Sequence, residues 1–224
     1  MRAPDATAAA QRDDPARPAV QRPRDHDPPA PRSWDYQRTR APYSHLAKRF
    51  FASLSRRSPS VSSRAWADAT LNPGERRLFA EMKTFDQRHA IGVAREVYER
   101  TGDALCARAA LMHDVGKLDC RLGPVLRSVA TVTGRYLPVT ADTWSRRWWR
   151  RVRDTPDGRL RPASWRERMA SYWMHPWEGR LMLDAAGADP YVSAWAEQHH
   201  HQYCAVDLLV PWAEACVMWD ADSD

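Results

Sequence analysis

The sequence predicts an all-α protein, and three observations support this prediction. From residue 45 onward, apolar residues recur at the three- and four-residue spacing that places them on one face of a helix. Proline and glycine stand at the ends of these stretches, where they start and stop helices. No alternation of apolar and polar residues longer than four residues, the pattern of a β-strand, stands out.

The first 42 residues differ from the rest in composition. They hold eight of the 17 prolines, eight arginines and six aspartates, and among their side chains only Val20, Trp34 and Tyr36 could pack. Such a segment cannot bury enough apolar surface to offset the entropy that it loses on ordering. We therefore expect residues 1–42 to form a disordered, solvated tail, with a nucleic-acid-binding arm as the alternative.

A helical extension is expected over residues 43–84. Residues 45–57 predict a short amphipathic helix with four apolar residues on one side: Leu46, Phe50, Phe51 and Leu54. Residues 62–82 predict two helices, the first capped by Ser62 or Ser63. The break between the two falls at Asn72-Pro73-Gly74.

Helices are expected throughout a domain that covers residues 85–224. Their predicted ranges are 86–100, 105–117, 121–137, 176–187, 190–202 and 211–224. Residues 105–117 are almost wholly apolar until Gly116, which indicates a buried helix. The helix over 176–187 begins with a proline and ends at Gly187.

The excess positive charge is concentrated in an insert at about residues 143–168. This insert contains nine arginines against Asp154, Asp157 and Glu167, and its net charge equals the +6 of the whole chain. Tryptophans alternate with the arginines over residues 144–153. We expect these tryptophans to pack on the helical core while the arginines stay in water. A phosphorylated substrate or nucleic acid, or an anionic membrane surface, are the alternative partners of this segment.

Several classes of protein are disfavoured. The longest apolar stretch, residues 208–219, has 12 residues and contains Pro211 and Glu214, whereas a membrane span needs about 20. The N-terminal residues lack the apolar region of a secretory signal. Four cysteines without a CxxC pair argue against a disulfide scaffold or a zinc ribbon. Together these features favour a cytoplasmic location.

The pair His113-Asp114 lies at the end of the apolar helix. A neighbouring imidazole and carboxylate are costly to bury unless something pairs with them, and a divalent metal ion would pair with both. Six of the eight histidines fall after residue 85, in or beside the predicted helices. The sequence therefore predicts a metal site, with buried or capping histidines as the structural alternative.

Over about residues 73–222, the order of these motifs resembles the HD-domain metal-dependent phosphohydrolase superfamily, and at a tighter level an actinobacterial-type group of HD-domain proteins. The matching segments are DQRHAIGVA, ALMHDVGKLD, YWMHPWEGRLMLDAAGADP, WAEQHH and CVMWDADSD. The resemblance implies a helical bundle with these metal ligands: His89, His113, Asp114, His175, His199, His200 and Asp220. His201 ranks behind His199 and His200, and Asp222 competes with Asp220. The spacing of 24 residues from His89 to His113, and again from His175 to His199, suits antiparallel helix pairs that return ligands to one end of a bundle.

The resemblance also implies an activity. One or two divalent ions (Mn, Fe, Mg, Co or Zn) would support hydrolysis of a phosphomonoester or phosphodiester, with a nucleotide-like or other phosphorylated small molecule as substrate. Asp114 would bridge the metals, and Lys117 would contact phosphate. Neither the GYP nor the ED motif of two known subgroups is present, so their substrates are not carried over. An HD-type di-iron oxygenase and a catalytically silent HD module that binds nucleotide or nucleic acid are the alternatives.

Overall fold

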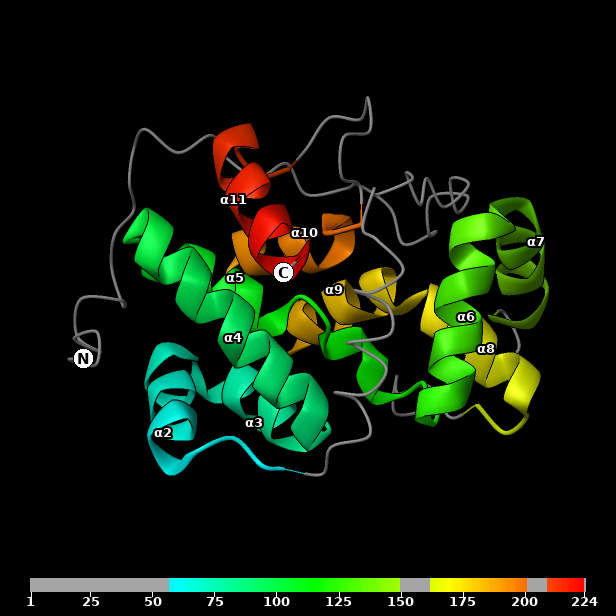
Figure 1. The fold of residues 1–224 in the computed structure, drawn as a ribbon, viewed down its shortest axis with the longest axis horizontal. Helices are drawn as coiled ribbons and strands as arrows, with labels where there is room; N and C mark the ends of the chain where they lie inside the picture. Colours follow the sequence, from blue (N-terminus) through cyan, green and yellow to red (C-terminus); the bar gives the residue numbers. More distant parts are fainter. Residues whose placement is uncertain (1–56, 150–161, 201–208, 224) are drawn as a thin grey trace.

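A computed structural model of the chain describes residues 57–149, 162–200 and 209–223. Over these residues the fold is all-α as predicted, with ten α-helices, one 3-10 helix and no strand (Figure 1). The predicted tail at 1–42 lies outside the described residues, and so does the predicted helix at 45–57 except for Arg57. None of the described helices is both long and apolar enough to cross a membrane.

Within each described stretch of the chain, the helices follow one another with connections of one to five residues. Their bounds are α2 Val61–Thr70, α3 Pro73–Glu81, α4 Thr84–Thr101, α5 Ala104–Met112, η1 Val115–Leu118, α6 Pro124–Tyr136, α7 Pro138–Trp149, α8 Trp165–Trp173, α9 His175–Ala185, α10 Pro190–Gln198 and α11 Trp212–Ser223. Helices α7 and α8 overlap the two ends of the Arg/Trp-rich insert at about residues 143–168, and the sequence predicted neither helix.

The helix starts show how local sequence sets the boundaries. Asn72 caps α3 and forms a reciprocal capping box with Glu75, as expected from the break predicted there. The cap of α2 is Ser60 rather than Ser62 or Ser63, and its hydroxyl accepts a hydrogen bond from the Ser63 amide. Helix α5 ends at Met112, earlier than predicted, because the chain tightens into η1 immediately afterwards.

Most of the helices share one core. Helices α2, α3, α4, α5, α10 and α11 contribute apolar side chains to a single cluster that includes Trp66, Phe79, Val97, Leu111 and Met218. The described part of the predicted extension, residues 57–84, therefore packs into the same body as the helices that follow it. In Figure 1 these elements fill the left and centre of the molecule.

Helices α6, α7 and α8 form a second, smaller group at the right of Figure 1. A separate apolar cluster lies among them, with Trp173 at its centre and Trp144 packed against it. Two polar contacts join this group to α4: Arg127 forms two hydrogen bonds with Asp86, at 2.6 and 2.9 Å, and Lys83 donates to the Leu122 carbonyl. Since Arg127 and Asp86 are largely buried, the bidentate pair fixes the orientation of α6.

Within the described part of the insert, Trp144 and Trp148 pack against neighbouring helices as expected. The Trp144 indole donates to the Arg166 carbonyl, and its ring lies 5.4 Å from the ring of Trp165 and 6.5 Å from that of Trp173. Arg146 and Arg147, on the same helix, are exposed. Trp144 thus packs on the small helix group while Arg146 and Arg147 face solvent, whereas Trp165 is 51% exposed.

Gly116 lets η1 approach α9 closely. A Cβ atom on Gly116 would lie 1.9 Å from the His175 carbonyl oxygen and 2.6 Å from the Gly179 amide nitrogen. Both of these atoms belong to the backbone, so they cannot move aside as a side chain could. The absence of a side chain at residue 116 therefore sets the position of the His113-Asp114 pair relative to His175.

We predict that Gly116→Ala lowers the free energy of unfolding by about 2 kcal/mol or more, because the added methyl group overpacks a backbone contact. Gly92→Ala is the matched control, since a Cβ there meets nothing within 4 Å and alanine is the better helix former. Urea denaturation of the two variants checks this. Equal stability of the two proteins would contradict the proposed close approach.

Candidate metal centre

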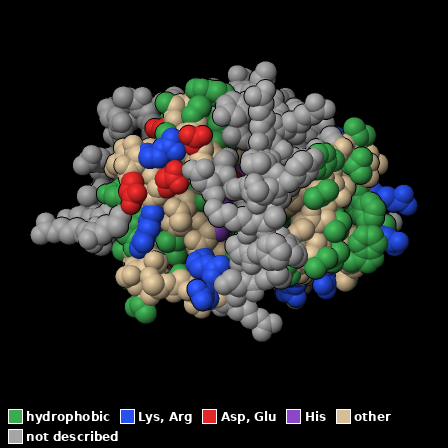
Figure 2. Space-filling model, viewed as in Figure 1, with side chains coloured by type: hydrophobic (Ala, Val, Ile, Leu, Met, Phe, Trp, Pro, Cys, Tyr) green, Lys and Arg blue, Asp and Glu red, His purple; other side chains and the backbone are tan. Residues whose placement is uncertain are grey.

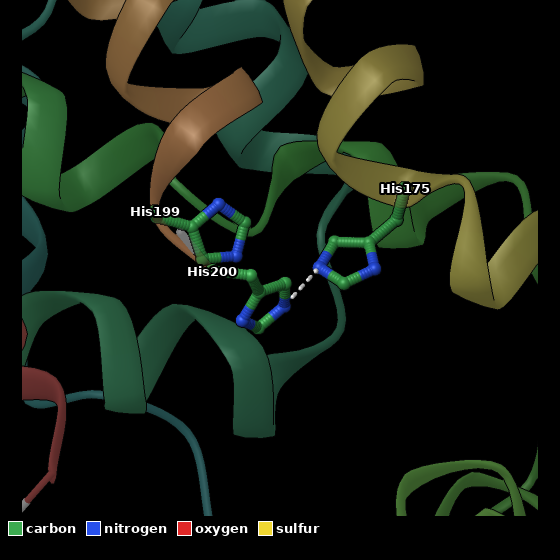
Figure 3. Close-up of side chains that lie close together, drawn as sticks. All are labelled: His175, His199 and His200. Carbon is green, nitrogen blue, oxygen red and sulfur yellow. Dashed lines mark hydrogen bonds between the residues drawn. The ribbon is translucent and has the colours of Figure 1, made fainter. Parts of the chain in front are cut away.

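Histidine and aspartate side chains from five parts of the fold meet at one place. His89 comes from α4, His113 and Asp114 from the end of α5, His175 from the start of α9, and Asp222 from α11. His199 and His200, at the end of α10, complete the cluster. Figure 3 shows His175 on α9 facing these last two rings.

The cluster divides into two groups of possible ligands. The ligand atoms of His89, His113 and Asp114 lie within 4.8 Å of one another, and so do those of His175, His199 and His200. Asp114 faces both groups. Its Oδ2 lies 3.4 Å from His113 Nε2, and its Oδ1 lies 3.4 Å from His175 Nε2 and 3.6 Å from His199 Nε2.

Three of the histidines are held in the same way. Nδ1 lies 2.7 Å from the Ala110 carbonyl oxygen in His113, 2.6 Å from that of Tyr172 in His175, and 2.8 Å from that of Ala196 in His199. A carbonyl only accepts, so Nδ1 must donate its proton in each case. In a neutral ring this leaves Nε2 with a free lone pair, which is the arrangement of a histidine that binds a metal.

Several of these inward-facing atoms lack a hydrogen-bond partner. Within the described part of the chain, His113 Nε2, His199 Nε2 and Asp114 Oδ1 are buried and make no hydrogen bond. A buried polar atom left in this state costs about 1–3 kcal/mol. Lone pairs that face a carboxylate also repel it, so the arrangement calls for a cation among these atoms, either a proton or a metal ion.

His175 and His200 show the spacing of two ligands on one ion. Their Nε2 atoms lie 3.2 Å apart and form a hydrogen bond in this structure, which the dashed line in Figure 3 marks. Two nitrogens bound at about 2.0–2.1 Å on a tetrahedral ion lie about 3.3–3.4 Å apart. The three-histidine group therefore fits a divalent ion that accepts nitrogen ligands.

The surroundings set the protonation states. Burial lowers the pKa of His175 to about 3, and it also lowers the pKa values of His199 and His200, so these rings are neutral at physiological pH. Burial opposes ionisation of Asp114, but the Lys117 ammonium and the His113 ring hold its pKa well below the usual range. For His113, burial is outweighed by the Asp114 carboxylate, and its pKa is raised. In the absence of a metal ion, a proton on His113 Nε2 would thus occupy the position of the cation.

Lys117 lies beside the metal-ligand candidates rather than apart from them. Its Nζ donates to Asp114 Oδ2 at 2.6 Å, and the side chain is largely buried. The ammonium also lies 5.7 Å from the centre of the Tyr172 ring. This places a positive charge next to the central carboxylate, where an anionic ligand of the site could also reach it.

The structure brings Asp222, and not the predicted Asp220, to the cluster. Asp222 Oδ1 lies 2.8 Å from His89 Nε2 and 3.6 Å from His113 Nε2. The side chain of Asp220 is 64% exposed and pairs with Arg100 at 3.0 Å. Residues two apart on a helix differ by about 200° in direction, so only one of the two aspartates can face inward. His201 lies outside the described residues.

A further acidic group lies elsewhere, between the start of α5 and α11. Ligand atoms of Asp103, Cys106 and Glu214 lie within 4.8 Å of one another. Asp103 already accepts from the amides of Leu105 and Cys106 as the cap of α5, and the hydroxyl of Tyr191 bonds to Glu214. These contacts give the group a structural role, and the sequence pattern did not single it out.

Comparison of the chain with protein-family models, with curated proteins and with solved structures found no match in any of the three. Conclusions about function therefore depend on the side chains of the cluster itself.

We predict that Asp222→Asn weakens binding of a divalent metal by at least about tenfold, whereas Asp220→Asn leaves it unchanged. The two substitutions remove the same charge from the same helix, two residues apart, so only the direction of the side chain differs. Calorimetric titration of the chelator-treated variants with Zn²⁺ or Mn²⁺ measures the effect. Equal affinity in both variants would remove Asp222 from the centre.

Proposed function

We propose that this chain is a metal-dependent phosphohydrolase that acts on a nucleotide-like or other phosphorylated small molecule. The observation that carries the proposal is the convergence of buried, neutral Nε2 atoms on Asp114, which lies between two groups of ligand candidates. Histidine nitrogens with one shared carboxylate are a typical donor set for a hydrolytic divalent-metal centre.

The residues divide between two metal positions in this proposal. His89, His113 and Asp222 would hold one ion, and His175, His199 and His200 the other, with Asp114 shared between them. Ions bound there would supply Lewis acidity, activation of water and neutralisation of charge on a phosphoryl group. The carbonyls of Ala110, Tyr172 and Ala196 would keep three of the rings in the ligand tautomer.

Lys117 has two tasks in the proposed reaction. It keeps Asp114 ionised and in place through the 2.6 Å contact, and it offers an ammonium to a phosphate oxygen. Both tasks need a positively charged side chain at this position of η1. Lys117 is thus proposed to orient the substrate, and Asp114 to hold the ions.

The proposal predicts release of phosphate or of a phosphomonoester from at least one member of a panel of nucleotides, phosphomonoesters and phosphodiesters, assayed with Mn, Co, Mg, Fe or Zn. Asp114→Asn should lower kcat by more than about a hundredfold, since it removes the ligand shared by both groups. Asp220→Asn, on the surface, serves as the matched control and should keep full activity.

Absence of turnover across the whole panel, in protein shown to hold metal, would refute the proposal. If iron-loaded protein consumed oxygen without releasing phosphate, the oxygenase alternative would replace it. A biological effect that survived Asp114→Asn would instead favour a silent binding module.

A further inference from the structure

Helix α6 carries an exposed apolar stripe. Val125, Val129, Val132 and Tyr136 follow one another at intervals of four, three and four residues, so they lie on one face of the helix. Between 46% and 64% of each of these residues is exposed. Leu137 and Val139 extend the apolar surface to the start of α7, where 56% and 73% of them are exposed.

The inner face of α6 carries polar or small side chains, whereas an ordinary surface helix turns its apolar face inward. Arg127 is bound to Asp86, Thr131 contacts the Tyr172 hydroxyl at 3.0 Å, and the Ala130 carbonyl accepts from the Trp173 indole at 2.9 Å. These directional contacts fix how the helix is turned. The valines therefore face outward because of specific bonds on the other side.

The neighbouring helices α7 and α8 carry arginine and tryptophan side chains that lie close to one another. The guanidinium of Arg147 lies 5.8 Å from the centre of the Trp148 ring, and that of Arg166 lies 5.5 Å from Trp148 and 5.2 Å from Trp165. Arg147, Arg166 and Trp165 are all exposed. Figure 2 shows hydrophobic side chains gathered over this part of the molecule, with Lys or Arg side chains at its outer edge.

We propose that the α6 stripe, defined by Val125, Val129, Val132 and Tyr136, docks on an anionic lipid surface, with the exposed arginines Arg147 and Arg166 of the neighbouring helices α7 and α8 adding electrostatic attraction. Exposed aliphatic side chains would enter the boundary of the lipid tails, tryptophan would lie at the level of the headgroups, and arginine would bind their phosphates. This attachment is distinct from the proposed hydrolysis and does not depend on it.

Two other binding partners, a nucleic acid and a second copy of the chain, would account for fewer features of this surface. Nucleic acid would use the arginines and the aromatic rings but has no counterpart for a row of exposed valines. A second copy of the chain could cover the valines, but an interface related by twofold symmetry would bring arginine-bearing edges of like charge toward each other. An anionic lipid surface offers apolar tails to the valines of the α6 stripe and phosphate groups to the arginines.

Flotation of the full chain with vesicles tests this proposal. We expect binding to phosphatidylcholine vesicles that contain about one third phosphatidylglycerol, no binding to pure phosphatidylcholine, and a loss of binding as salt is added. Val129→Gln with Val132→Gln should reduce partitioning by about tenfold or more. Arg147→Gln with Arg166→Gln should reduce it by about thirtyfold at low salt, since each cation near the surface contributes about fivefold.

Matched controls keep the test specific. Val61→Gln removes a valine that is 88% exposed on α2, and Arg77→Gln removes an exposed arginine on α3, and both should bind as the parent chain does. Circular dichroism establishes that each variant is folded, and Val125→Gln with Val139→Gln provides a second stripe variant should the first unfold.

The proposal is overturned if the chain fails to bind anionic vesicles, or if the stripe variants bind as Val61→Gln does. Light scattering that shows a dimer lost in the stripe variants, without vesicle binding, would assign the surface to a second copy. Binding of an oligonucleotide that depends on the arginines alone, again without vesicle binding, would assign it to nucleic acid.

Discussion

The geometry of the site depends on three hydrogen bonds from imidazole Nδ1 to the backbone carbonyl three residues earlier. They turn the rings of His113, His175 and His199 so that each Nε2 points inward, toward Asp114. Neutral rings held in this way present lone pairs to a carboxylate, which is unfavourable until a cation lies between them. That electrostatic requirement, more than the number of histidines, supports a metal centre here.

The helical architecture makes these bonds available. His113 and His199 occupy the C-terminal ends of α5 and α10, where carbonyls have no partner within the helix and can accept from a side chain. His175 follows α8 after one residue, Met174, and uses the carbonyl of Tyr172 in the last turn of that helix. Gly116 then allows η1 to lie against the start of α9. The ends of three helices and one close backbone contact thus bring Asp114 and the three rings together.

Much of the fold could be predicted from the sequence because its signals are local. Helical spacing, the proline at the start of α9 and the break at Asn72-Pro73-Gly74 identified the helices around the core. Helices α7 and α8 were missed because a dense run of arginine and tryptophan does not show an apolar face by itself, and their packing depends on Trp173 from outside α7. The order of histidines indicated the ligand candidates. The choice between Asp220 and Asp222 could not be made, because it depends on how α11 is turned against α4, which is a tertiary contact.

Nitrogen-15 NMR of the histidine rings can show whether the buried Nε2 atoms bind a cation. In chelator-treated protein at neutral pH, we expect His175 and His199 to be neutral with the proton on Nδ1. Addition of Zn²⁺ should shift their Nε2 resonances and leave the Nδ1 protons in place. Rings with the proton on Nε2, or resonances that do not respond to metal, would contradict the account.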